Sequence, residues 1–312
     1  MFNHFTFSKH SFLIRARDAI MLPLYKGSTL RGGFGNTFKK VVCAIRTKNC
    51  DDCILKVKCI YFYIFETSPD EESDVLKNYN RIPHPFVIEP PMDENRIFQP
   101  GDMLTFNLIL IGKATEYIPY FIYAFDALGT NGIGKGRGKY ELVEVRCLKP
   151  EKDYIVYSSK DKILKNSETI IMSDILKTIP KTNTITLNLI TPLRIILNGN
   201  LLVNLKFHHL IRSLLRRVST LSYFHCEVKL NIDFKGMINR AENAEKVVDE
   251  LKWFDWERYS RRQDTKMKLG GLIGRVSFKG DFEEFLPLLK LGELLHAGKG
   301  TAFGLGRYEI IS

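Results

Sequence analysis

A short phrase occurs twice in this chain, as GRGKYEL at residues 136–142 and as GLGRYEI at residues 304–310. Both copies follow an apolar run that predicts a helix, and both precede residues that suit a β-strand. A glycine-rich turn between a helix and a strand lets backbone N–H groups approach an anion closely. The repeat therefore predicts two similar domains, each with an anion-binding loop.

The composition favours a nucleic acid as partner. The chain has 312 residues, which is enough for two domains of ordinary size, and its formal net charge is +11. A basic protein is expected to bind an acidic partner, and RNA is the simplest one. An anionic membrane would need a basic amphipathic helix at a terminus, and we find none in the sequence.

The N-terminus lacks the apolar core of a signal peptide. The longest apolar stretch, residues 187–205, is interrupted by Pro192, Arg194 and Asn198, so no segment is expected to span a bilayer. We therefore expect a cytoplasmic protein that does not bind membranes.

The order of predicted elements indicates an α+β fold with two tandem ferredoxin-like (RRM-like, βαββαβ) domains. In the first half, strands within 5–22, 86–90 and 105–112 alternate with helices over 29–42 and 117–128. The second half repeats this scheme from residue 184 to the C-terminus. The predicted boundaries are 1–148 for the first domain, 149–185 for a polar connector and 186–312 for the second domain.

Five motifs occur here in a characteristic order: TLRGGFG (29–35), a cysteine segment ending in CIYFYIFE (59–66), WFDWERYSRRQ (253–263), KLGGLIG (268–274) and GELLHAGKGTAFGLGRYE (292–309). In these motifs the chain resembles the CRISPR precursor-RNA processing endoribonucleases of the RAMP superfamily, the Cas-six family. The resemblance is closest to the branch with a four-cysteine insertion in the first domain. It is densest over residues 28–66 and 205–312.

The resemblance implies that the protein binds CRISPR repeat RNA and cuts the precursor of guide RNAs without a catalytic metal. The ribose 2′-OH attacks the adjacent phosphate and leaves a 2′,3′-cyclic phosphate and a 5′-OH. The alternative is a RAMP subunit that holds RNA in a CRISPR effector without cutting it. Other effector subunits and a second copy of the chain, as a homodimer, are further partners left open.

Four cysteines lie close together: Cys43, Cys50, Cys53 and Cys59. In a reducing compartment this spacing indicates a metal site rather than disulfides. Zn²⁺ is the first choice and an iron–sulfur cluster the second, since four thiolates can hold either. Because no ligand position is spare, we expect a structural site. A redox or metal-sensing protein built on this cluster is the weakest of the functional alternatives.

The two glycine-rich loops are the predicted RNA-binding segments, because flexible backbone and basic side chains suit a phosphate chain. The first loop offers Gly134, Lys135, Gly136, Arg137, Gly138 and Lys139, and the second offers Gly298, Lys299, Gly300, Thr301, Gly304, Gly306 and Arg307.

The segment WFDWERYSRRQ adds a third group of candidate RNA-binding residues. Arg258, Arg261 and Arg262 can hold phosphates, while aromatic rings can stack on unpaired bases. For Trp253 and Trp256, packing in the core is the favoured interpretation.

The catalytic residues are predicted as two alternatives. The resemblance implies a general base, often a His on or just after the first helix, but no His occurs between His10 and His84. The first alternative is His296 at the mouth of the second loop, because imidazole titrates near neutral pH. The second follows family members that use Tyr, Lys, Ser and Arg in the first domain; the matching residues are Tyr25, Lys26, Ser28 and Arg31.

Overall fold

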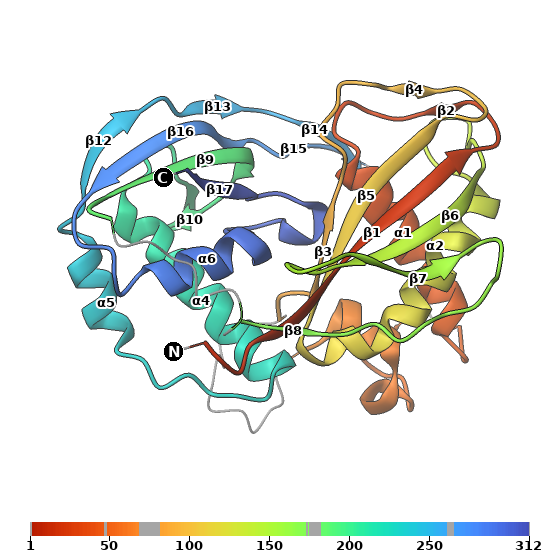
Figure 1. The fold of residues 1–312 in the computed structure, drawn as a ribbon, viewed down its shortest axis with the longest axis horizontal. Coiled ribbons are helices and arrows are strands. Elements are labelled where there is room, and N and C mark those ends of the chain that lie inside the picture. Colours follow the sequence, from red (N-terminus) through yellow and green to blue (C-terminus); the bar gives the residue numbers. More distant parts are fainter. Residues whose placement is uncertain are drawn as a thin grey trace. The chain divides into compact units, whose positions relative to one another are not determined.

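The computed structural model describes residues 2–46, 49–68, 82–172, 174, 182–260 and 265–311. The chain divides into two compact units (Figure 1). The N-terminal domain contains Thr6–Ile170 and Phe224–Cys226, and the C-terminal domain contains Met1–Phe5, Ile171–Tyr223 and Glu227–Ser312. The division thus falls at Ile170, within the segment that the sequence analysis treated as a connector.

The N-terminal domain has an antiparallel sheet in the order β3-β5-β1-β6-β7. Two helices, α1 (Gly27–Val42) and α2 (Ile118–Asn131), pack together on one face of it (Figure 1). The strands are β1 (Thr6–Ala16), β3 (Phe86–Glu89), β5 (Met103–Ile111), β6 (Tyr140–Leu148) and β7 (Tyr154–Ser158). Without β7, this is the ferredoxin-like order, with the second, third, first and fourth strands side by side.

Smaller elements complete this domain. The short strand β8 (Ile170–Ile171) pairs with β1, and β2 (Ile20–Met21) pairs with β4 (Ile97–Phe98). The segment around the cysteines forms η1 (Lys56–Lys58) and η2 (Phe62–Glu66), and η3 (Gly112–Tyr117) precedes α2. Residues 149–185 therefore contribute two strands, β7 and β8, to the first sheet.

The C-terminal domain repeats the arrangement with the sheet order β12-β16-β9-β17. Its elements in chain order are β9 (Thr184–Leu193), α4 (Phe207–His225), β12 (Glu245–Asp249), β13 (Lys252–Phe254), β16 (Gly271–Lys279), α6 (Leu286–Leu295) and β17 (Tyr308–Ile311). Additional elements are β10 (Ile196–Leu197), β11 (Asn200–Leu201), α5 (Phe234–Ala241), β14 (Glu257–Ser260), β15 (Thr265–Lys268) and η4 (Thr301–Phe303). The two tandem ferredoxin-like domains are thus confirmed.

Aromatic packing holds the helices of the N-terminal domain against its sheet. Phe34 of α1 stacks on Phe121 and Phe125 of α2, with ring centroids 4.9 and 4.7 Å apart. Phe12 of β1 stacks on Phe106 of β5 at 5.1 Å, and Phe125 contacts these two rings with centroids 5.0 and 4.8 Å away. All five rings are at most 1% exposed, and offset stacking adds to the free energy gained from their burial.

The glycines of α1 admit side chains from neighbouring elements. A Cβ at Gly33 would lie 3.0 Å from Leu128 of α2, and one at Gly35 would lie 3.3 Å from Phe65 of η2. A methyl group at either position would therefore press on a neighbouring side chain. A Cβ at Gly32 would meet nothing within 4 Å among the residues that the structure describes.

The tyrosine of the repeated phrase has the same role in both domains. Tyr140 donates its hydroxyl hydrogen to the carbonyl of Phe125 in α2, and Tyr308 donates to the carbonyl of Leu289 in α6, both at 2.6 Å. Burial raises the pKa of both phenols well above its usual range, so each remains a donor. The phrase thus ties the last ferredoxin strand to the helix before it.

Candidate nucleic-acid interface and active site

Residues 132–139, here called the N-terminal basic loop, connect α2 to β6. Gly134 has a φ of +73°, and a Cβ there would lie 2.1 Å from the carbonyl oxygen of Met21, so only glycine fits. The backbone N–H groups of Ile133 and Lys135 donate to Gly138 and Met21, each at 2.9 Å. These two N–H groups are occupied by hydrogen bonds to carbonyl groups of the protein. An anion at this loop would therefore be bound mainly by side chains.

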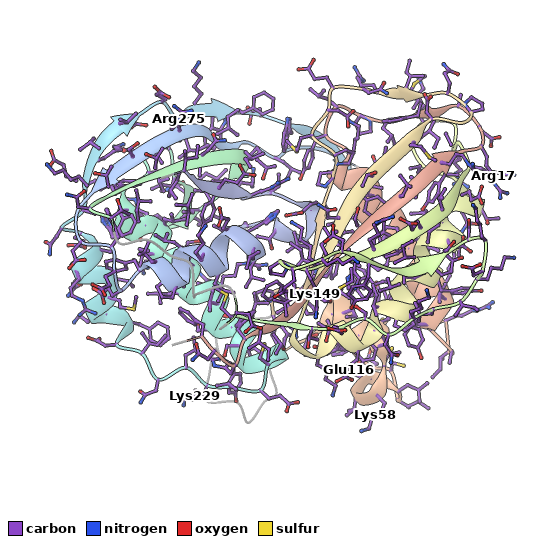
Figure 2. All side chains as sticks on the ribbon, viewed as in Figure 1. Arg17, Lys58, Glu116, Lys149, Lys229 and Arg275 are labelled. Atoms are coloured by element: carbon purple, nitrogen blue, oxygen red, sulfur yellow. The ribbon has the colours of Figure 1, made fainter. Side chains whose placement is uncertain are left out.

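The side chains of the N-terminal basic loop present positive charge to solvent. Lys135, Arg137 and Lys139 are exposed. The carbonyl of Lys139 accepts from the N–H of Arg17 at 2.9 Å, and the Arg17 side chain is 65% exposed at the edge of the domain (Figure 2). Glu141 lies 3.7 Å from Arg17 and balances part of this charge. The surface is suited to a phosphate backbone.

Residues 296–307, here called the C-terminal basic loop, connect α6 to β17 at the equivalent position. Gly306 has a φ of +72°, and a Cβ there would lie 1.8 Å from the carbonyl oxygen of Ala297. The N–H of Lys299 donates to the carbonyl of Arg194 at 2.8 Å, and Leu305 is fully buried. This loop is therefore a packed turn, and it does not present a row of unoccupied N–H groups to an anion.

The predicted RNA-binding residues of this loop differ in exposure. Lys299 is exposed, Arg307 is half-buried with a guanidinium nitrogen 3.3 Å from Glu309, and Thr301 is buried. Gly298 and Gly300 are half-buried, while Gly304 and Gly306 are buried. Lys299 is the residue of the set best placed to contact an anion.

His296 is fully buried, contrary to the expectation that it lies at the mouth of the loop beside RNA. It is the C-cap of α6, with φ 63° and ψ 161°, and its Nδ1 lies 3.1 Å from the carbonyl oxygen of Leu305. Gly132 has almost the same conformation, φ 76° and ψ 155°, at the C-cap of α2. A non-glycine residue is strained in this region, and its surroundings must hold it there.

Arg217 of α4 is one of the residues that hold His296 in this conformation. Its buried guanidinium donates to the carbonyls of Leu295 and His296 at 2.9 and 3.1 Å. Burial lowers the pKa of Arg217 to about 9, which still leaves it cationic at neutral pH, and a cation stabilises the C-terminal end of a helix. Arg217 and His296 therefore position the C-terminal basic loop.

The other predicted catalytic set lies at the start of α1, but two of its members face inward. Lys26 is fully buried, and its Nζ donates to the carbonyl of Asp93 at 2.6 Å and lies 3.5 Å from the Asp93 carboxylate. Tyr25 is buried, and burial raises its pKa well above the usual range, so it is a poor general base. Ser28 is half-buried, with no hydrogen-bond partner for its Oγ among the residues that the structure describes.

Arg31, the fourth member, contacts His84, which lies between Pro83 and Pro85. Its Nη2 lies 3.1 Å from Nε2 of His84, and its guanidinium lies over the ring of Phe65 at 4.7 Å. The imidazole of His84 stacks on Phe86, with ring centroids 5.6 Å apart and an interplanar angle of 12°. Because a guanidinium can only donate, Nε2 of His84 accepts and the proton of the neutral ring lies on Nδ1.

A second histidine orients the segment that carries His84. His225 is 1% exposed, and its Nε2 lies 3.0 Å from the carbonyl oxygen of Pro83 while its Nδ1 lies 3.1 Å from the hydroxyl of Tyr63. The carbonyl must accept from Nε2–H, so Tyr63 donates to Nδ1 of the neutral ring. The imidazole of His225 thereby links Pro83, the residue just before His84, to the hydroxyl of Tyr63.

The four cysteines do not form the predicted metal cluster in this arrangement. All four thiols are free and half-buried, and Nζ of Lys39 lies 3.4 Å from Sγ of Cys50. Within the described ranges, no three His, Cys, Asp or Glu side chains form a group that could hold a metal ion. Four thiolates are a donor set that suits Zn²⁺ or an iron–sulfur cluster, so the structural metal site stays a prediction.

The remaining predicted arginines are only partly covered by the structure. Arg258 lies on β14, which pairs with β15. Arg261 and Arg262 lie outside the described residues. None of the helices in the described part of the chain is long and apolar enough to cross a membrane.

Two ferredoxin-like domains in tandem, each with a basic glycine-rich loop before its last strand, define the architectural class of this protein. Two family models match it. Residues 5–169 match the model AF_1859_N, described as an N-terminal domain, and residues 187–308 match the model of the CRISPR-associated endoribonuclease Cas6. The first model covers just over half of the chain, so the chain belongs to the family that has an AF_1859_N N-terminal domain, and its C-terminal domain matches the Cas6 endoribonuclease model.

Solved structures share the whole fold. The Cas6 (TTHB231) product complex is 13% identical, with a TM-score of 0.60 over 98% of this chain and 99% of that chain. Thermus thermophilus Cas6 (TTHB231) has a TM-score of 0.56 at 13% identity, with the same coverage of both chains. A partial Cas6-RT-Cas1–Cas2 complex is 12% identical, with a TM-score of 0.59 over 98% of this chain and 46% of that chain.

A protein of Archaeoglobus fulgidus is 26% identical over 305 residues, which is 93% of this chain and 93% of that protein. It extends the similarity over both domains.

Proposed function

We propose that this protein is an endoribonuclease that binds CRISPR repeat RNA and cuts precursor transcripts into guide RNAs. The observation that carries the proposal is the pair of basic glycine-rich loops at equivalent positions in the two domains of a chain whose second domain matches the Cas6 model. The net charge of +11 agrees with a polyanionic substrate. One of the solved structures with the same fold is described as a product complex of Cas6.

The proposed reaction begins at the pair formed by Arg31 and His84. Arg31 moves its N–H donors from Nε2 of His84 to the non-bridging oxygens of the scissile phosphate. This frees the Nε2 lone pair, which accepts the proton of the ribose 2′-OH. A general base of this kind typically accelerates proton transfer by about 10²–10⁴-fold.

The 2′ oxygen then forms a bond to phosphorus, and the bond from phosphorus to the 5′ oxygen breaks. The 5′ oxygen takes a proton from water, and His84 returns its proton to solvent, so no proton is gained or lost overall. The products are a 2′,3′-cyclic phosphate and a 5′-OH. The guanidinium of Arg31 stabilises the extra negative charge of the transition state. These steps use side chains of the N-terminal domain and need no metal ion.

A non-catalytic RNA-binding subunit is the second candidate function. The buried His296 and the absence of a histidine from α1 favour it. A binding subunit would use the same RNA-binding surface as the endoribonuclease and would differ only in that it does not cut the RNA.

Incubation of purified protein with repeat RNA in EDTA separates the two functions. We expect one discrete cut, a 5′ fragment whose end resists phosphatase until acid opens the cyclic phosphate, and a 3′ fragment that polynucleotide kinase labels directly. Retention of uncut RNA on the protein would support the binding subunit. Cleavage that stops when EDTA is added would contradict the metal-free chemistry.

The cysteine segment has no role in this reaction. The structural zinc that its spacing predicts stays a prediction, and the zinc content of purified protein tests it. Other CRISPR effector subunits and a homodimer likewise stay as proposed partners.

A further inference from the structure

Trp253 of β13 is exposed, although the sequence favoured a place for it in the core. The residue is 41% accessible, and its Nε1–H donates to Oδ1 of Asp255 at 3.1 Å. The indole is therefore fixed in orientation while much of its surface faces solvent. An exposed aromatic ring that is held in one orientation offers a surface on which a base can stack.

The other side of the indole packs against a glycine. A Cβ at Gly270 would lie 2.7 Å from Cζ2 and 2.8 Å from Nε1 of Trp253, so no larger residue fits beneath the ring. Trp253 pairs with Leu272 across β13 and β16, and Leu272 pairs with Leu193 on β9. Three neighbouring strands thus hold the ring at one end of the sheet.

Arg194 connects this ring to the C-terminal basic loop. Its Nη1 donates to the carbonyl of Gly270, beneath the indole, and its own carbonyl accepts from the N–H of Lys299 at 2.8 Å. A Cβ at Gly298 would lie 2.4 Å from the same carbonyl oxygen. One residue therefore links the exposed ring to the exposed cation of the loop.

We infer that Trp253 is a stacking platform for an unpaired RNA base whose neighbouring phosphate is held by Lys299. Positive charge near the ring suits this ligand, since Lys299 is exposed on the loop that Arg194 links to Gly270. Asp255, the nearest carboxylate, has its Oδ1 engaged by the indole N–H. This site rests on the proposed function, because it continues the same RNA interface. Stacking tolerates any base, with purines offering the larger surface.

Two probes measure the base and the phosphates separately: a twelve-nucleotide oligoadenylate, and an oligonucleotide of the same length made of abasic ribose phosphate units. The wild-type protein is expected to bind oligoadenylate about tenfold more tightly than the abasic strand. Trp253→Ala should bind the two strands alike, and Trp253→Phe should keep most of the preference. The wild-type comparison of the two probes does not depend on how any variant folds.

Tryptophan fluorescence locates the contact, because the chain has only two tryptophans. Oligoadenylate should quench the fluorescence of the Trp256→Phe variant as strongly as that of the wild type. It should hardly change the fluorescence of the Trp253→Phe variant. Equal affinity of the wild type for both probes, or a quench that arises from Trp256, would overturn this site and leave the proposed function standing. Failure of the wild type to bind any RNA, repeat RNA included, would overturn the proposed function together with this site.

Discussion

His84→Ala is expected to slow cleavage of repeat RNA by about 10²–10⁴-fold while the affinity for that RNA changes by less than about twofold. The physical reason is the position of Nε2, which lies 3.1 Å from Arg31 and accepts a proton only when the guanidinium moves to a phosphate. Single-turnover cleavage with excess protein measures the chemical step, and filter binding of a 2′-deoxy substrate measures affinity without cutting.

Two further variants make the result specific. Arg31→Lys keeps a positive charge but loses the planar pair of donors, so we expect cleavage to fall although RNA is still bound. His208→Ala is the matched control, because His208 is a half-buried histidine on α4 that the reaction does not use. An unchanged cleavage rate in a folded His84→Ala protein would contradict the assignment, and the general base would then have to be sought elsewhere.

Reversing the three exposed charges of the N-terminal basic loop should produce the largest loss of RNA affinity. Replacing Lys135, Arg137 and Lys139 by Glu removes three cations that can neutralise phosphates. The slope of log affinity against log salt should therefore become shallower by about two units. At low salt, the affinity for single-stranded RNA should fall by about 100-fold or more, because each Glu also repels the phosphate backbone.

A control with the same change in net charge separates this contact from a general electrostatic effect. Lys58, Lys160 and Lys229 are exposed outside both basic loops, and Lys58 and Lys229 are labelled in Figure 2. Changing these three to Glu should shift affinity only modestly and leave the salt slope close to that of the wild type. If both triple variants lose affinity equally, net charge rather than the loop determines binding.

The ferredoxin-like order could be predicted because its signals are local. The helical period of α1 and the apolar run of α2 mark the elements, and the repeated phrase marks the end of each domain. The buried tyrosine of each copy explains why the phrase recurs, since Tyr140 and Tyr308 make the same hydrogen bond to the preceding helix. The strands β7 and β8 could not be seen, because β7 is mostly half-buried and β8 is only two residues long.

The candidate active site was harder to predict from the sequence, because its contacts join residues that are far apart in the chain. Arg31 and His84 are separated by 53 positions, and no local pattern indicates that their side chains meet. The one feature of His84 that the sequence does show is its place between Pro83 and Pro85, two residues before the apolar segment that forms β3. The burial of His296 could not be predicted either, because it depends on contacts with Arg217 and Leu305 that form only in the folded domain.

Cross-linking of bound RNA to the protein tests the central claim most directly, namely that each of the two basic loops contacts RNA. Repeat RNA that carries 4-thiouridine at single positions is bound, irradiated and digested, and the cross-linked peptides are identified by mass spectrometry. The account predicts cross-links to peptides that contain residues 132–139 and to peptides that contain residues 296–307. Cross-links that avoid both loops while the RNA remains specifically bound would contradict it.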